Sequence, residues 1–475
     1  MADTSSNSLQ QLPLHLVARI LAELETIQQL GSAILSHRIF LLAFNDNLHS
    51  VTSDIIASQI PSDVLPFALA LEESTRVNKK SADAISSVLV RLESRIRIPA
   101  DTFPCLLRLS ASQAASISKS YTLVEILSDG LVEEAIPVLN ERLLLSHPLH
   151  TSPSERFRLS RAFFRYQLMC ELLCYPMSAR GATKGHFSLF FQNFSPWVND
   201  QLVCAYTYLE RKVYGVFGDV AAHDIVLGEM PVYWQEDPAG DAYVQEFLLQ
   251  GLPYLVSICH AKTYDERSNL ITLSRFKAIN WDCHPSQRLN EMIPDLIRPS
   301  SMLGYEDLVE VRTEMLPMLA QPLDGEQDAL VSKACLIWHV THLESPLADP
   351  TWRREEDRNL LQMGYVLWDY PDDASESDRQ SIWEAVRDGP NVWPSRDIWT
   401  DREVTRSLRQ REDIWLAGGT GYWPRDSFDF SKIDGVAKER QKSLIEKWKR
   451  EDEKWANSSS LDEADEADDE DSTTN

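Results

Sequence analysis

Pairs of a capping residue and a proline mark where several helices of this chain are predicted to begin. Ser152-Pro153 is followed by Glu155, which completes a capping box, and Ser195-Pro196 opens a second segment. A serine oxygen here accepts a hydrogen bond from the first helical turn, and the fixed φ of proline suits that turn. Apolar residues then recur at helical spacing over about five turns, at Val198, Leu202, Tyr206, Leu209, Val213 and Val216. This pattern predicts long helices.

Other signals also favour helices over strands. Asp349-Pro350 is predicted to open a further helix, and Thr122 with Glu125 is predicted to form another capping box. The 17 glycines among 475 residues leave few positions that accept positive φ without strain, so tight hairpins should be rare. Only short stretches such as residues 95–98 could be strands. We therefore predict a mainly α fold, with a large irregular helical body and little sheet.

Charge and composition exclude several classes of partner. Hydrophobic residues make up 43% of the chain and charged residues 25%, which is ordinary for a protein that buries a core. The formal net charge of −26 repels phosphate backbones and anionic lipid, and no local basic patch is visible in the sequence. We therefore expect neither nucleic acid nor a membrane surface as a partner.

Cysteine usage and the N-terminal sequence indicate an intracellular protein. The seven cysteines are odd in number and scattered through apolar surroundings, as is typical of reduced thiols. The N-terminus lacks the basic and then apolar pattern of a signal peptide, and no run of about 18 apolar residues indicates a membrane span. We expect the protein to be cytoplasmic or nuclear.

The C-terminal part differs from the middle of the chain in composition. Ten of the thirteen tryptophans follow residue 330, which suggests a boundary near residue 345. Residues 436–455 are predicted to form a charged helix, either a solvated surface helix or a partner-binding one, with an apolar seam at Val436, Leu444, Trp448 and Trp455. Residues 456–475 hold eight acids and no base, and we expect disorder because ordering them would bury almost nothing.

No catalytic motif is found in the sequence. It has no Gly-x-Ser-x-Gly elbow, no Gly-x-x-x-x-Gly-Lys phosphate loop, no His-Glu-x-x-His and no Cys-x-x-Cys. The glycine-rich stretch 418–421 is expected to end a helix and not to bind phosphate. The most metal-like group is Cys335, His339 and His342, which one helix would place on one face.

A zinc site would also need a fourth ligand and a polar second shell. Aliphatic and aromatic residues stand between Cys335, His339 and His342, so ordinary core positions are the favoured interpretation of all three. We therefore expect a protein that is not an enzyme and that has no metal site and no cofactor.

The N-terminal residues carry a repeated aliphatic pattern. Leu-Pro stands first, and apolar residues follow at spacings of three and four, while Thr26 can cap a second helix that continues through Leu42. The spacing predicts two short amphipathic helices joined by a tight connection. The pattern consists of Leu12, Pro13, Leu16, Val17, Ile20, Leu21, Leu24, Ile27 and Leu30, and then Leu35-Ser36-His37-Arg38 with Ile39-Phe40.

This pattern resembles the F-box, whose members begin with Leu-Pro, continue with paired aliphatics and end with a cysteine, a basic residue and an aromatic. Members fold as a small helical bundle that docks on the Skp adaptor of a cullin-based ubiquitin ligase. Here His15 replaces the usual acid, Ser36 stands where cysteine is common, and the late tryptophan is absent. The resemblance implies that the bundle and its adaptor-binding face are built from Leu12, Pro13, Leu16, Ile20, Leu21, Leu24 and Leu30.

The remainder of the chain resembles a family of fungal proteins with no assigned activity. The resemblance is carried by residues 194–197, 201–202, 208–211 and 418–423. It implies a shared fold and a fungal source.

The predicted organisation follows from these observations in chain order. It consists of a disordered N-terminus at 1–8, an F-box-like helical domain at 9–50, a helical domain at 51–345, a tryptophan-rich helical region at 346–455 and an acidic disordered tail at 456–475. The favoured function is a non-catalytic substrate receptor whose partners are a Skp-type adaptor with its cullin complex and a protein substrate. A helical scaffold without a ubiquitin role and a metal-dependent enzyme are the alternatives. Exposed apolar side chains on the N-terminal helices would favour the receptor over the scaffold.

Overall fold

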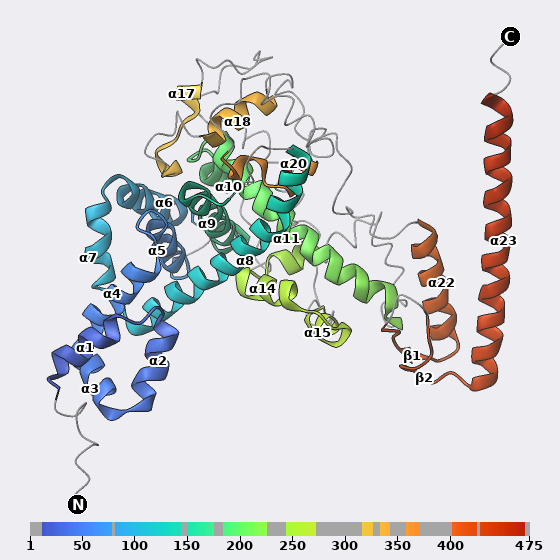
Figure 1. The fold of residues 1–475 in the computed structure, drawn as a ribbon, viewed down its shortest axis with the longest axis horizontal. Coiled ribbons are helices and arrows are strands. Elements are labelled where there is room, and N and C mark those ends of the chain that lie inside the picture. Colours follow the sequence, from blue (N-terminus) through green and yellow to red (C-terminus); the bar gives the residue numbers. More distant parts are fainter. Residues whose placement is uncertain are drawn as a thin grey trace, which may run out of the picture. The chain divides into compact units, whose positions relative to one another are not determined.

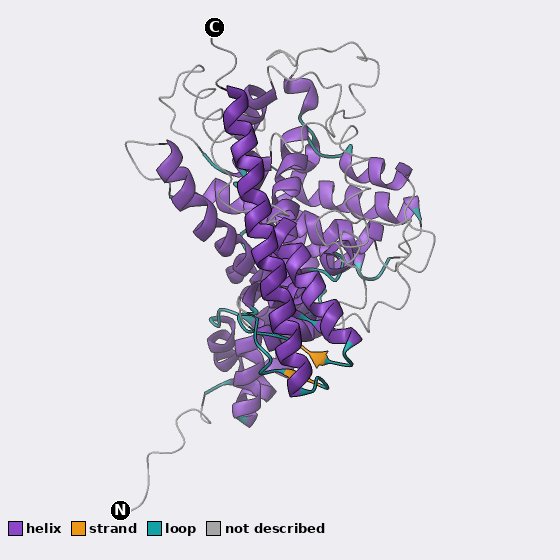
Figure 2. Ribbon diagram, turned by 90° about the vertical axis from the view of Figure 1, so that its right-hand side faces the viewer, coloured by secondary structure: helices purple, strands orange, loops and turns teal. Residues whose placement is uncertain are grey.

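The computed structural model describes residues 12–77, 81–143, 150–174, 184–225, 244–271, 316–325, 333–342, 358–369, 401–424 and 428–470. Helices dominate these ranges (Figure 2), and the strands among them are β1, Thr420–Gly421, and β2, Ile433–Asp434, which pair antiparallel. The prediction of a mainly α fold with little sheet is confirmed. Residues 95–98, considered as a strand, instead form the last turn of helix α6 and its C-cap residue, Ile98. Within the described ranges, no helix is both long enough and apolar enough to cross a membrane.

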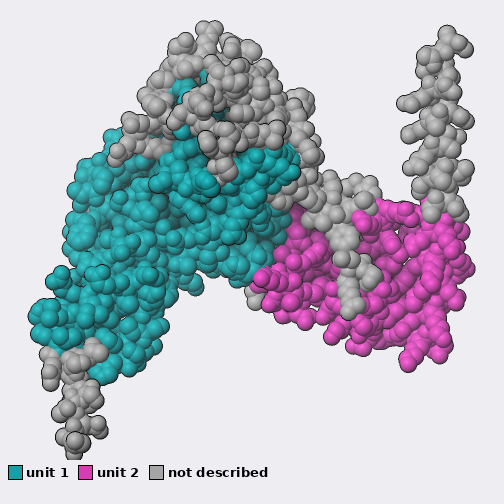
Figure 3. Space-filling view, viewed as in Figure 1, with its two compact units in different colours: residues 1–213, 245–260, 278–393 teal, residues 214–244, 261–277, 394–475 magenta. Residues whose placement is uncertain are grey.

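The chain divides into two compact units (Figure 3). Because each unit is assembled from separated stretches of sequence, neither the expected boundary near residue 345 nor a separate domain at 9–50 coincides with this division. Unit 1 consists of residues 1–213, 245–260 and 278–393, and unit 2 of residues 214–244, 261–277 and 394–475.

The first part of unit 1 is arranged around the long helix α8, against which α2, α4 and α5 pack (Figure 1). The Ser110 hydroxyl accepts the N–H of Gln113 at 3.3 Å, and the Gln113 side chain accepts the N–H of Ser110 at 2.8 Å, which caps α8. The capping box predicted at Thr122 is wrong, because Thr122 lies inside α8 and its hydroxyl donates to the Ser118 carbonyl at 3.2 Å. The elements are α1 (Leu14–Ala22), α2 (Ile27–Ser36), α3 (Arg38–Asp46), α4 (Leu48–Gln59), α5 (Leu65–Ser74), α6 (Ala82–Arg97), η2 (Pro99–Asp101), α7 (Thr102–Leu106) and α8 (Ala111–Leu143).

The two Ser-Pro helix starts in the middle of the chain are confirmed. At the start of α9, Ser152 accepts the N–H of Glu155 at 3.2 Å while the Glu155 carboxylate accepts the N–H of Ser152 at 2.6 Å. Helix α11 begins at Pro196 as predicted, but the Ser195 hydroxyl does not cap it. The helix predicted from Pro350 lies outside the described residues. The elements here are α9 (Pro153–Met169), η3 (Cys170–Cys174), α10 (Lys184–Phe191), α11 (Pro196–His223), α14 (Leu252–His260), α17 (Leu316–Leu319), η8 (Pro322–Asp324), α18 (Lys333–His342), α20 (Arg358–Gln362) and η9 (Tyr365–Leu367).

Buried arginines on α9 bind segments of unit 1 that are distant in sequence. Arg158 forms a 2.7 Å ion pair with Asp369. One turn further, Arg161 donates to the Gln201 side chain at 2.6 Å and to the backbone carbonyl of Asp324. Burying a guanidinium is unfavourable unless its N–H groups find acceptors, so these bonds stabilise the path of the bound segments against α9.

A third buried arginine, Arg165, lies one turn beyond Arg161 and contacts the start of α11. It donates to the Asn199 side chain at 2.7 Å and to the Val198 carbonyl. The centre of its guanidinium lies 3.6 Å from the centroid of the Phe194 ring, within cation–π range. Burial lowers the pKa of Arg165 well below its ordinary value, and the nearby charge of Arg161 acts in the same direction.

Unit 2 has a small core of its own, formed by the buried side chains of Ile225, Ile414, Trp423, Ile433, Val436, Leu444 and Trp448. Helix α22 ends at Leu416 and is followed by Gly418, whose φ is 80°. There the N–H of Gly418 donates to the Trp415 carbonyl at 2.8 Å, and that of Gly419 to the Ile414 carbonyl at 2.9 Å. This pattern ends a helix through a left-handed residue, which confirms the turn expected at 418–421. The elements are α15 (Tyr264–Leu270), α22 (Asp401–Leu416) and α23 (Lys438–Glu470), with β1 and β2.

The apolar seam predicted at residues 436–455 packs into this core. Leu444 and Trp448 of α23 are buried, as is Val436 just before the helix, while Trp455 is half-buried beneath the guanidinium of Arg409. The indole N–H of Trp448 also donates to Asp413 of α22 at 2.8 Å. The seam is therefore occupied by contacts within unit 2.

Helix α23 continues to Glu470, into the stretch 456–475 for which we expected disorder. That expectation considered burial alone and needs correction for residues 456–470. Propagating a helix from a packed segment avoids the unfavourable nucleation step, and the stretch has no glycine or proline to stop it. Residues 471–475 and 1–8 lie outside the described residues.

Candidate docking site on the N-terminal helices

Helix α1 begins directly after Pro13 and buries one side of its surface. The Pro13 carbonyl accepts the N–H of Leu16 at 2.9 Å and that of Val17 at 3.3 Å, which starts the helix. Val17 and Leu21, one turn apart, are buried together with Ala18 on the side where α1 packs against α3 and α4. The remaining sides of α1 are left for solvent or for a partner.

Thr26 caps the second helix as predicted, because its hydroxyl accepts the N–H of Gln29 at 3.2 Å. The expectation of only two helices is wrong. Helix α2 ends at Ser36, and His37 adopts an extended conformation in which its ring nitrogen accepts the N–H of Ile39 at 3.1 Å. His37 therefore caps a separate helix, α3, and the N-terminal region forms three helices.

The predicted adaptor-binding residues divide into an exposed and a buried group. Pro13 is exposed, as are Leu16 at 39% and Ile20 at 51% of their surface, and Leu12 and Leu24 are half-buried. Leu21 and Leu30 are each only 2% exposed. The last two can stabilise the bundle, whereas Leu16 and Ile20, one turn apart, present apolar surface on α1.

Helix α3 adds two exposed leucines that the sequence analysis did not single out. Leu41 and Leu42 are 43% and 42% exposed, while Ile39 and Ala43 on the same helix are buried. Both lie on the helix that packs directly against α1. The sequence predicts a single helix from residue 27 to 42, and the break at His37 changes the face on which the residues after it lie.

Helix α2, by contrast, is attached to the body of unit 1 through Ser118 of α8. The Ser118 hydroxyl accepts the N–H of Ile27 at 3.4 Å and donates to the Gln59 side chain of α4 at 2.7 Å. Ile27 and Leu30 of α2 are buried at this junction. The inner face of α2 therefore belongs to the core of the chain, and the exposed apolar residues of α1 and α3 are the candidate docking surface.

We call Pro13, Leu16, Ile20, Leu41 and Leu42 the N-terminal apolar residues. Two features suit them to protein binding. They stand on helices fixed to each other and to α4, so a partner would meet a preformed surface. Their side chains also leave apolar area in water that another protein could cover.

Two of the three residues in the metal-like group of α18 have side chains that the structure describes, and both belong to the core. Cys335 and His339 are buried, as expected for ordinary core residues, and the side chain of His342 lies outside the described residues. Among the side chains that the structure describes, no cluster of three or more histidine, cysteine or acidic groups could hold a metal ion.

No family model, no curated protein and no solved structure matches this chain.

Proposed function

We propose that this protein is a non-catalytic interaction adaptor, an F-box-type substrate receptor of a cullin-based ubiquitin ligase, which binds a Skp-type adaptor through α1 and α3. The observation that carries the proposal is the exposure of Leu16 and Ile20 on α1 beside a helix with exposed Leu41 and Leu42. The Leu-Pro sequence at 12–13 and the paired aliphatics that follow it supply the resemblance.

The energetics of this surface suit a reversible complex. Fully burying a leucine or isoleucine contributes about 1.5–3 kcal/mol, so covering a half-exposed one contributes about 1 kcal/mol. The N-terminal apolar residues can therefore supply a meaningful part of a binding energy without destabilising the unbound protein. The rest of unit 1 and unit 2 would present the substrate, and the protein would act in the cytoplasm or nucleus, where such ligases work.

Co-purification with a Skp-type adaptor tests the proposal. The full chain is compared with a Leu16→Ala, Ile20→Ala double variant and with a Leu41→Ala, Leu42→Ala double variant. The control is Val90→Ala, which removes a side chain that is 60% exposed on α6 and does not belong to the N-terminal apolar residues. We expect the control to recover adaptor like the wild type and both double variants to lose most of it.

The alternative function is a helical scaffold without a ubiquitin role. It is favoured by the burial of Leu21 and Leu30 and by the attachment of α2 to Ser118, which direct part of the F-box-like pattern into the interior. The receptor function would be contradicted if the wild type and both double variants recovered equal amounts of adaptor, or if none of them recovered any. The scaffold function would then be the remaining interpretation.

A further inference from the structure

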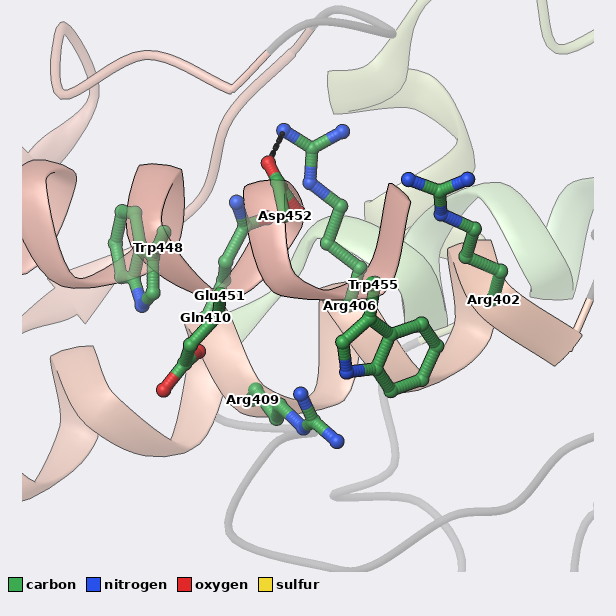
Figure 4. Close-up of a pocket in the computed structure, with 8 residues that line it drawn as sticks. All are labelled: Arg402, Arg406, Arg409, Gln410, Trp448, Glu451, Asp452 and Trp455. Carbon is green, nitrogen blue, oxygen red and sulfur yellow. Dashed lines mark ion pairs between the residues drawn. The ribbon is translucent and has the colours of Figure 1, made fainter. Parts of the chain in front are cut away.

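Unit 2 contains a cleft that belongs to neither the N-terminal helices nor any motif of the sequence. Its volume is about 430 Å³, within the range of about 300–1,000 Å³ typical of small-molecule sites. Residues of α22 and α23 line it together with Trp423 and Phe428, which follow β1. A smaller cavity adjoins it and shares Arg406, Gln410, Trp448 and Asp452 (Figure 4).

One wall of the cleft is apolar and largely aromatic. Phe428 packs edge to face against two buried tryptophans, with its ring centroid 5.1 Å from that of Trp423 and 4.8 Å from that of Trp448. Phe428 and Ile445 are half-buried and form the accessible part of the wall. Because both buried tryptophans contact the phenylalanine ring, this wall offers a packed apolar surface to a flat ring.

The polar feature of the cleft is the carboxamide of Gln410. This residue of α22 is only 6% exposed and lines both cavities. Its side chain makes no hydrogen bond to any part of the chain that the structure describes. The nitrogen and oxygen of the carboxamide reach the space of the cleft, where a ligand can pair with the N–H and the carbonyl oxygen. Glutamine recognises adjacent donors and acceptors of nucleobases in this way.

Basic side chains lie at the same cleft. Arg406 reaches from α22 to Asp452 of α23, to which it is bonded at 2.8 Å (Figure 4). Lys449 is exposed and forms no ion pair with the described residues. The acidic residues of the lining are Glu403 and Asp452, and Asp452 is already paired with Arg406. An anionic group is therefore best placed beside Lys449.

We propose that this cleft binds a nucleoside monophosphate. The base lies against Phe428 and Ile445, its donor and acceptor edge pairs with the Gln410 carboxamide, and its phosphate is held by Lys449 with Arg406 next to it. Each part matches known nucleotide chemistry: bases stack on aromatic side chains, and lysine and arginine bind phosphate. The net charge of −26 opposes long polyanions at the whole surface, whereas a single phosphate meets the local field of the cleft.

Isothermal titration of the full chain with AMP, GMP, CMP and UMP tests the proposal. We expect at least one to bind saturably with a Kd of about 1 mM or tighter. The corresponding nucleoside and inorganic phosphate should each bind at least about tenfold more weakly, because each lacks one half of the contacts. Absence of binding by all four nucleotides, or equal binding of phosphate alone, would overturn the proposal.

Two variants locate the binding in this cleft. Gln410→Leu keeps the size of the side chain and removes both hydrogen-bonding groups, and Lys449→Met removes the charge. Each should weaken the best nucleotide about tenfold, while Lys442→Met, an exposed lysine of α23 outside the cleft, should leave its affinity unchanged. Lys449 is exposed, so its variant tests the site even if Gln410→Leu unfolds. Unchanged affinity in Lys449→Met would also overturn the proposal.

Discussion

The backbone N–H of Ser195 donates a 2.9 Å hydrogen bond to the carboxylate of Asp324, which lies 129 residues later in the chain. The other carboxylate oxygen accepts the N–H of Gln321 at 3.0 Å. Asp324 is buried, and burial raises its pKa to about 6 although these hydrogen bonds and the charge of Arg161 act to lower it. The contact that joins the start of α11 to η8 is therefore made by a carboxyl group that titrates near neutral pH.

The stability of the protein should reflect this titration. Because the folded-state pKa of Asp324 lies above its ordinary value of 3.8, its contribution to stability is complete below that value and is lost as the pH rises through about 6. Relative to Asp324→Asn, which cannot titrate, the free energy of unfolding of the wild type should rise by about 1 kcal/mol from pH 7 to pH 5. Urea denaturation of both proteins measures it, and parallel pH curves would contradict the prediction.

Neighbouring aliphatic residues of α1 should differ sharply in their effect on stability. Leu21→Ala removes a side chain that is 2% exposed and should lower the free energy of unfolding by about 2–5 kcal/mol. Ile20→Ala removes one that is 51% exposed and should lower it by about 1 kcal/mol or less. Thermal and chemical denaturation provide the comparison. Similar losses in the two variants would mean that Ile20 is enclosed and is not available for docking.

Two helical glycines should respond in opposite ways to alanine. At Gly215 in α11 a Cβ atom would meet no neighbour within 4 Å, so Gly215→Ala should stabilise the protein by about 0.5–1 kcal/mol through the helix preference of alanine. At Gly130 in α8 the same atom would lie 2.6 Å from the Tyr208 hydroxyl, so Gly130→Ala should be destabilising. Melting temperatures of the two variants should move in opposite directions, and a stabilised Gly130→Ala would show that Tyr208 moves aside.

The helical fold could be predicted from the sequence wherever local chemistry decides it. The Ser-Pro pairs predicted the starts of α9 and α11, and Thr26 predicted that of α2. The hydroxyls of Ser152 and Thr26 cap their helices, whereas that of Ser195 does not. The break at His37 could not be predicted in this way, because histidine is not among the preferred capping residues. As a result, the sequence does not predict that Leu42 is exposed.

The candidate sites depend on contacts between helices, which the spacing of apolar residues in the sequence does not predict. The aliphatic pattern correctly picked out residues of the N-terminal bundle, but whether Leu21 or Ile20 faces solvent depends on how α3 and α4 pack. The cleft of unit 2 is a stronger case, because Gln410, Phe428 and Lys449 come from separate segments. The strongly negative overall charge of the chain gave no indication of the basic residues around the cleft. Arg406 and Lys449 lie near each other only because α22 packs beside α23.

The buried arginines of α9 also limit how this protein can change in evolution. Arg158, Arg161 and Arg165 stand at spacings of three and four, so they project from one side of the helix. Inserting or deleting one residue before Arg158 would turn the whole set by about 100° relative to the capped end at Ser152. Substitutions at the exposed residues of its first turn, Ser154 and Arg156, can accumulate singly, whereas a change in the length of α9 would displace every guanidinium at once. Homologues, however divergent, should therefore keep the number of residues between the cap and the third arginine.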